Sequence, residues 1–144
     1  MTQIKFFSDI HLEFSKYKYD HIWTPSITDK DDILILAGDI STGTSAKPFI
    51  DDLCNNFKQV LYLLGNHEGY NYDLIKVIQD WKDYELNGPK NFHFMHNEVR
   101  FIDGVRFIGG TKWTEFNGEN PNSMMQAPRI INDYNVINID GRDL

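Results

Sequence analysis

Three short β-prone runs in the first half of the chain each end in a group of polar residues. The runs span residues 2–7, 33–37 and 60–64. The first and second are expected to be buried strands of a parallel sheet, and the third is a further apolar run. The polar groups that follow the runs are therefore predicted to gather at the carboxyl ends of neighbouring strands, where open parallel sheets bind ligands.

Two segments with apolar residues at helical spacing alternate with these runs. The first covers residues 46–57, with Ser45 as its expected N-cap and Pro48 in its first turn. The second begins near Asn71 and stops at Asn87-Gly88-Pro89. Alternation of strand and helix predicts parallel pairing with right-handed crossovers.

The pattern changes in the second half of the chain. Residues 91–95 predict a short strand, and residues 99–102 and 105–108 flank Asp103-Gly104, a strong hairpin signal. A loop-rich region follows, with one short helix expected near residues 123–133. We therefore expect an α/β fold, a layered sandwich around a mixed central sheet, in a single domain over residues 1–144.

Composition excludes several classes of protein. The 144 residues are 41% hydrophobic and 24% charged, as in an ordinary globular domain. The net charge of −7 argues against a sequence-independent grip on nucleic acid, which needs a basic surface. No run approaches the ~20 apolar residues of a membrane span, no signal peptide is expected, and the single cysteine, Cys54, fits a reducing compartment. We therefore expect a cytoplasmic protein.

The residues at the strand ends are of the types that bind divalent metals. Asp9 and His11 follow the first run, Asp39 follows the second, and Asn66 and His67 follow the third. Carboxylate, imidazole and amide oxygen are suitable ligands for such ions. In an extended backbone, Asp9 and His11 would lean into the same cleft. Because converging carboxylates and imidazoles contribute little to stability, a metal site explains them better than strand capping does.

These residues carry a resemblance to a known family. Asp9-Ile10-His11, Gly38-Asp39 and Gly65-Asn66-His67-Glu68 resemble the first three motifs of the calcineurin-like metallophosphoesterases, and residues 105–116 resemble the strand and loop that follow in one branch of that family. The resemblance implies a metallophosphoesterase-like sandwich and hydrolysis of phosphomonoesters or phosphodiesters by a hydroxide that bridges two divalent metals. The metals would be Mn²⁺, Fe²⁺/Fe³⁺ or Zn²⁺.

The resemblance also implies a role for each motif residue. Asp9 and His11 would bind the first metal, Asp39 would bridge both metals, and Asn66 would bind the second. His67 would act at the leaving-group oxygen rather than as a ligand. Glu68 would orient its loop through hydrogen bonds.

The chain departs from the family pattern after Gly110. The later histidine motifs are absent, since no histidine follows His96. The first metal would therefore lack one protein ligand and the second would lack two, and the sandwich would stop before its second sheet is completed. One sheet face would then be exposed, which predicts self-association or a complementary C-terminal segment that covers it. Nucleic acid is expected only as a possible substrate.

Two alternatives to an active short enzyme follow from this departure. The chain could be an N-terminal fragment whose remaining ligands come from a second polypeptide or from a continuation of the reading frame. It could instead be a degenerate, non-catalytic module that acts through its surface.

Other residues with possible roles are expected to be structural. His21, His93 and His96 are expected at the surface or rim rather than as replacement ligands, and Asp31, Asp32, Asp51 and Asp52 as solvated charges. Phe6, Phe7, Tyr62 and Phe107 are expected in the core. Trp113 and Phe116 are the aromatic residues that could line a substrate cleft.

Overall fold

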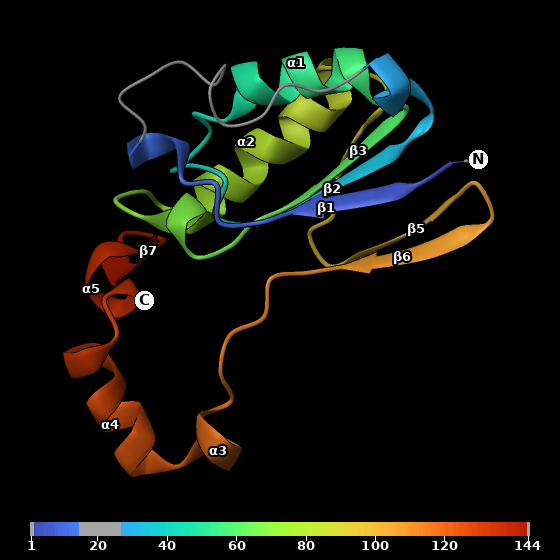
Figure 1. The fold of residues 1–144 in the computed structure, drawn as a ribbon. Coiled ribbons are helices and arrows are strands. Elements are labelled where there is room, and N and C mark those ends of the chain that lie inside the picture. The colour runs from blue at the N-terminus through green and yellow to red at the C-terminus, as the bar shows by residue number, and fades with distance from the viewer. Residues whose placement is uncertain (1, 15–26, 144) are drawn as a thin grey trace.

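A parallel sheet lies at the centre of the fold (Figure 1). The computed structural model describes residues 2–14 and 27–143. The strands β1 (Ile4–Phe7), β2 (Ile33–Ala37), β3 (Gln59–Leu63) and β4 (Phe92–Phe94) pair in that order, each parallel to the next. Short 3₁₀ turns, Leu12–Phe14, Ile27–Asp31 and His67–Gly69, lie in the connections. The expected α/β class is confirmed.

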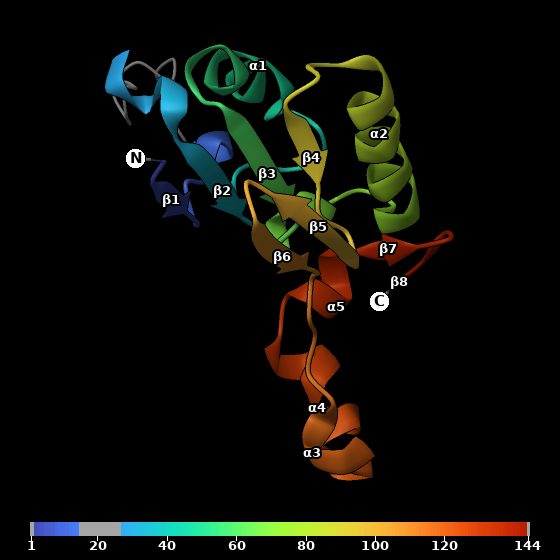
Figure 2. The ribbon, with the colours of Figure 1, turned by 90° about the vertical axis from the view of Figure 1, so that its right-hand side faces the viewer.

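Two crossover helices cover one face of this sheet (Figure 2). They are α1 (Lys47–Asn56) and α2 (Leu74–Asn87), and both bury apolar side chains against β2, β3 and β4. Trp81 of α2 is fully buried, and its indole N–H donates to the carbonyl of Gly43 at 3.1 Å. The apolar side of each helix therefore forms the main core.

The caps of these helices differ from the sequence prediction. Ala46, not Ser45, occupies the N-cap of α1, because the Ser45 hydroxyl donates instead to the carbonyl of Thr42 at 2.6 Å. Helix α2 begins at Leu74 rather than near Asn71, since the Asp73 carboxylate accepts from the backbone N–H of Ile75 at 3.0 Å. Both helices end as predicted, within a residue.

The antiparallel strands form a separate hairpin against the opposite face. Strands β5 (Glu98–Ile102) and β6 (Val105–Gly109) turn at Asp103 (φ 50°) and Gly104 (φ 79°), both left-handed, as a tight hairpin requires. The expectation of one mixed central sheet is therefore wrong in this detail. The chain turns at Asn97 (φ 56°), so β5 passes beneath the sheet instead of extending its edge.

The hairpin covers only part of that face. It packs against Ile33, Leu61 and Met95, whereas Phe6 on the edge strand β1 is 75% exposed. Phe6 and Phe7 are therefore not core residues, Phe107 is partly buried, and only Tyr62 of that expected aromatic set is fully buried. Position at the edge of the sheet, which residue patterning does not reveal, explains the difference.

The remaining residues form an arm that returns to the carboxyl ends of the strands (Figure 1). It contains α3 (Phe116–Glu119), α4 (Pro121–Ile130), α5 (Asp133–Val136), β7 (Asn138–Ile139) and β8 (Arg142–Asp143). Ile137 is fully buried against Gly69, and the backbone N–H of Asn71 donates to the carbonyl of Val136 at 2.7 Å. These contacts fix α5 beside the strand ends. In the residues described, no helix has both the length and the apolarity needed to cross a bilayer.

Candidate metal centre

Three predicted ligands meet where β1 and β2 end. The ligand atoms of Asp9, His11 and Asp39 all lie within 4.8 Å of one another. The backbone is left-handed at each of them, with φ of 55°, 52° and 54°. Such conformations are uncommon outside glycine and are concentrated at functional sites.

The route to this convergence differs from the extended alternation expected for Asp9 and His11. The two loops are joined by backbone hydrogen bonds, from the N–H of Asp9 to the carbonyl of Gly38 at 3.1 Å and from the N–H of His11 to the carbonyl of Asp39 at 3.0 Å. The loop after β1 therefore follows the loop after β2, and the left-handed residues turn their side chains into one cleft.

Two glycines allow the loops to approach closely. A Cβ atom on Gly38 would lie 2.6 Å from the backbone nitrogen of Gly65. A Cβ atom on Gly65 would lie 2.3 Å from a carboxylate oxygen of Asp39. A side chain at either position would therefore push the loops after β2 and β3 apart, as expected for glycine at a close backbone approach.

Glu68 joins the same two loops from within the protein. Its carboxylate is fully buried and accepts hydrogen bonds from the backbone N–H groups of Asp39 (3.1 Å), Ile40 (2.9 Å) and Gly65 (2.7 Å), and from the hydroxyl of Tyr62 (3.0 Å). Burial raises the pKa of Glu68, while these hydrogen bonds oppose the rise. One side chain thus fixes the backbone on both sides of Asp39.

His67 lies between two aromatic rings. Its ring stacks on Tyr70, with centroids 4.2 Å apart, and meets the His11 ring edge-on at 4.3 Å. Its backbone N–H donates to the Asp39 carboxylate at 2.8 Å. His67 is therefore held beside the predicted ligands.

Glu13, which the sequence interpretation missed, contacts both imidazoles. Its Oε1 lies 3.1 Å from Nδ1 of His11 and 2.9 Å from Nδ1 of His67. Burial alone would raise the pKa of Glu13, but a backbone hydrogen bond and the two imidazoles lower it overall. Its other oxygen is buried with no hydrogen-bond partner among the described residues. Its position two residues after His11 was the available signal.

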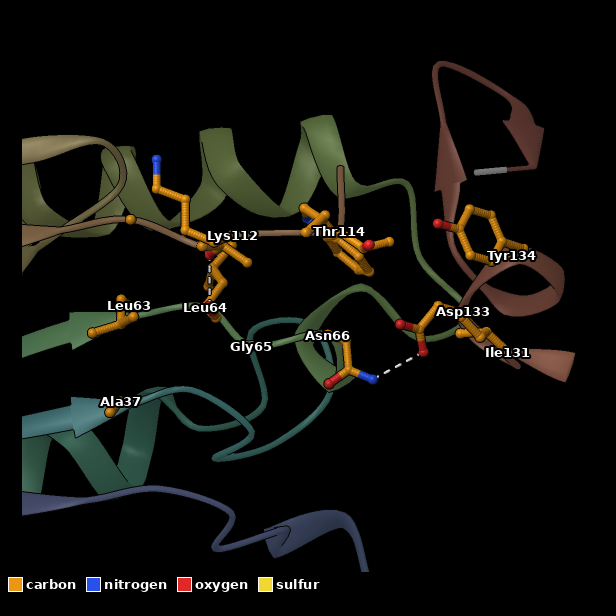
Figure 3. Close-up of a pocket in the computed structure, with 13 residues that line it drawn as sticks. Ala37, Leu63, Leu64, Gly65, Asn66, Lys112, Thr114, Ile131, Asp133 and Tyr134 are labelled. Carbon is orange, nitrogen blue, oxygen red and sulfur yellow. Dashed lines mark hydrogen bonds between the residues drawn. The ribbon is translucent and has the colours of Figure 1, made fainter. Parts of the chain in front are cut away.

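Asn66 faces the C-terminal arm. Its amide nitrogen donates to Asp133 at 2.9 Å and to the hydroxyl of Tyr70 at 3.2 Å (Figure 3). A pocket of about 480 Å³ opens beside it, lined by Lys112, Trp113 and Tyr134 among others. Trp113 thus lines a cleft next to the site, whereas Phe116 lies in a separate hollow against α4.

The remaining histidines do not join the site. Nε2 of His93 lies 2.6 Å from the side-chain oxygen of Gln59, on the sheet, and the ring of His96 stacks on Phe94 with centroids 5.8 Å apart. Neither belongs to a group of candidate ligands among the described residues. His21 lies outside the described residues.

The donor set fits a divalent first-row metal. Asp9, His11 and Asp39 combine carboxylate and imidazole, which suit Mn²⁺, Fe²⁺ and Zn²⁺. His11, Glu13 and His67 form a second group whose ligand atoms also lie within 4.8 Å of one another. The buried, unpartnered oxygen of Glu13 adds an acceptor that a cation would satisfy.

Comparison with known proteins shows which family model and which relative this chain matches. A sequence model described as calcineurin-like phosphoesterase matches residues 2–143. The chain is also 30% identical, over 150 aligned residues, to an uncharacterized protein of Acanthamoeba polyphaga mimivirus. That alignment covers 95% of this chain and 52% of the mimivirus protein, so the chain spans about half the length of this curated relative.

Proposed function

Since the chain belongs to the calcineurin-like phosphoesterase family, we propose that it hydrolyses phosphomonoesters or phosphodiesters at the centre formed by Asp9, His11 and Asp39. The convergence of these three side chains on left-handed backbone is the observation that carries the proposal. Mn²⁺, Fe²⁺/Fe³⁺ or Zn²⁺ would be the bound metals, two in number, with Asn66 as a ligand of the second.

Each residue has a distinct part in this proposal. Bound metal would supply activated water and polarise the phosphoryl oxygens. Asp9, His11 and Asp39 would hold that metal. His67 would donate a proton to the leaving-group oxygen. Because Glu13 occupies Nδ1 of His67, Nε2 is the nitrogen left to face the substrate, and Glu68 keeps the loop that carries His67 in place.

Hydrolysis of bis-p-nitrophenyl phosphate with added Mn²⁺ tests this proposal. We expect turnover by the wild-type chain and a loss of about 100-fold or more in His67→Ala, with metal content retained, because His67 is not proposed as a ligand. His93→Ala is the matched control, since it removes an imidazole from the sheet rather than from the centre. Turnover that His67→Ala leaves unchanged would contradict the assigned role.

A second candidate function rests on the ligands of the second metal. Among the described residues, the predicted set for that metal contains only Asp39 and Asn66, and the mimivirus relative is about twice as long as the matched region. A chain that acts only with a complementary polypeptide, or that binds without catalysis, fits this observation. The exposed Phe6 and Ile4 would lie under such a partner or under a second copy.

Mixing experiments separate these functions. Activity that appears only after addition of the part of the mimivirus relative that the alignment leaves unmatched would favour the complementary polypeptide. Robust turnover by this chain alone, lost in His67→Ala, would exclude a non-catalytic module. Size-exclusion chromatography of wild type and Phe6→Ser would report self-association through the exposed face.

A further inference from the structure

The side chain of Asn66 does not cap the turn that it precedes. Asn66 occupies the N-cap of the 3₁₀ turn His67–Gly69, where an asparagine oxygen usually accepts from the backbone N–H groups that follow. No such hydrogen bond forms here. Among the described residues, the hydrogen bonds of this amide are made by its nitrogen, to Asp133 and to Tyr70. Its oxygen is therefore free to bind another partner.

The chemistry of Asp133 fixes which end of the amide faces the arm. An ionised carboxylate only accepts hydrogen bonds, so the amide nitrogen must point toward it. A flipped amide would place its oxygen against the carboxylate of Asp133. The oxygen of Asn66 is consequently turned away from Asp133, as Figure 3 shows. Asp39 lies close by, since its carboxylate accepts from the backbone N–H of His67, the next residue.

Asp133 is itself held in place by its surroundings. It begins α5, whose end is anchored by the buried Ile137 and by the hydrogen bond from Asn71 to Val136. The Tyr70 hydroxyl donates to the same carboxylate oxygen at 2.7 Å, and the Tyr70 ring carries the stacked His67. Burial, followed by the hydrogen bond to Asp133, raises the pKa of Tyr70, so this hydroxyl keeps its proton.

We propose that Asp133 is a positioning residue that orients the Asn66 amide so that its oxygen faces the metal centre. The inference rests on the proposed function, in which Asn66 is a metal ligand. It makes the C-terminal arm, 67 residues away in sequence, part of the centre. Removing a side chain that orients a metal ligand typically costs ten- to a hundredfold in metal affinity.

The test compares three variants of the full chain. Asp133→Ala removes the acceptor, and Asp133→Asn retains an oxygen that can accept from Asn66. Ile137→Ala loosens the arm that carries Asp133, so it should shift the amide resonances and weaken Mn²⁺ binding in the same direction as Asp133→Ala. Two measurements apply to each variant: Mn²⁺ affinity and stoichiometry by calorimetric titration, and the metal-free NMR resonances of the Asn66 side-chain amide, identified by their loss in Asn66→Ala.

We expect Asp133→Ala to weaken Mn²⁺ binding about tenfold or more and to shift the amide resonances, while Asp133→Asn restores most of both. Three results would overturn the inference: unchanged amide resonances in Asp133→Ala, wild-type Mn²⁺ affinity in that variant, or no recovery of affinity in Asp133→Asn.

Failure of the proposed function gives a different pattern. A wild-type chain without esterase activity, whose Mn²⁺ affinity and amide resonances still respond to Asp133→Ala, would contradict hydrolysis and support the positioning role. An active wild type whose Mn²⁺ affinity and amide resonances do not respond to Asp133→Ala would support hydrolysis and contradict the positioning role. A wild type that binds no Mn²⁺ would overturn both.

Discussion

The two faces of the parallel sheet are covered to very different extents. On the helix side, Tyr62, Trp81 and Phe92 are almost completely buried. On the hairpin side, Phe6 is 75% exposed, and the hairpin itself exposes Phe101 and Ile108. Stability should therefore depend on the helix side, whereas the polar strand ends between the faces should determine function.

Substitutions of aromatic residues on the two faces should test this difference most clearly. Trp81→Ala leaves a large cavity in the helix-side core and should cost about 3–5 kcal/mol of unfolding free energy. Phe6→Ala removes an exposed ring and should change that free energy by about 0.5 kcal/mol or less. Urea unfolding measures both. Similar losses in the two variants would mean that the hairpin side is as well packed as the helix side.

At the strand ends, stability and metal binding should change together. Glu68→Gln replaces an acceptor oxygen with an NH₂ group that faces N–H and O–H donors, so we expect a loss of about 1–3 kcal/mol and weaker Mn²⁺ binding. Glu85→Gln, on the rim beside Arg100, is the matched control and should leave Mn²⁺ binding unchanged. Unfolding in urea and calorimetric titration provide the two readouts. Loss of stability without loss of Mn²⁺ affinity would mean that Glu68 stabilises the fold but does not support metal binding.

The smallest expected effect is on the exposed edge strand, which is attached by charge as well as by pairing. Lys5 forms an ion pair with Asp29 and lies 3.3 Å from the Asp32 carboxylate. A hydrogen bond from the backbone N–H of Gln3, together with Lys5, lowers the pKa of Asp32 below its ordinary 3.8. Asp32 is thus 5% exposed and paired, not solvated as the sequence suggested.

The sign of the pH effect follows from that lowered pKa. Because the folded state favours the ionised carboxylate, Asp32 contributes its full stabilisation above pH 3.8 and loses it as the pH falls through the lower, folded pKa. Asp32→Asn should therefore lower Tm slightly at neutral pH, and the difference from wild type should shrink in acid. A difference that stays constant down to pH 3 or below would contradict the role of this charge.

Most of the fold could be predicted because its signals are local. The run at residues 33–37 coincides with β2, and Asp103-Gly104 marks the hairpin turn. Local signals do not say which strand lies at the edge of the sheet, so Phe6 was misplaced. They also do not say where a hairpin packs, so β5 and β6 were expected in the central sheet.

The candidate site likewise contains residues that could be predicted from the sequence and residues that could not. Asp9, His11 and Asp39 follow strands of the parallel sheet, so their meeting at one edge could be predicted from sheet topology, whereas the left-handed turns that bring their side chains together could not. Glu13 escaped notice because its approach to His67 depends on the 3₁₀ turn at Leu12–Phe14. Asp133 escaped notice because it reaches Asn66 through an arm that packs far from its own place in the sequence. Such contacts depend on tertiary packing and leave no periodic pattern.

Metal content per chain tests the central claim most directly. Wild type and Asp39→Asn would be dialysed against trace Mn²⁺ and Zn²⁺ and measured by elemental analysis. Because Asp39 is the proposed bridging ligand beside Asp9 and His11, we expect wild type to retain at least one ion per chain and the variant to lose most of it. Equal metal content in the two proteins, or no metal in wild type, would contradict a metal centre at these strand ends.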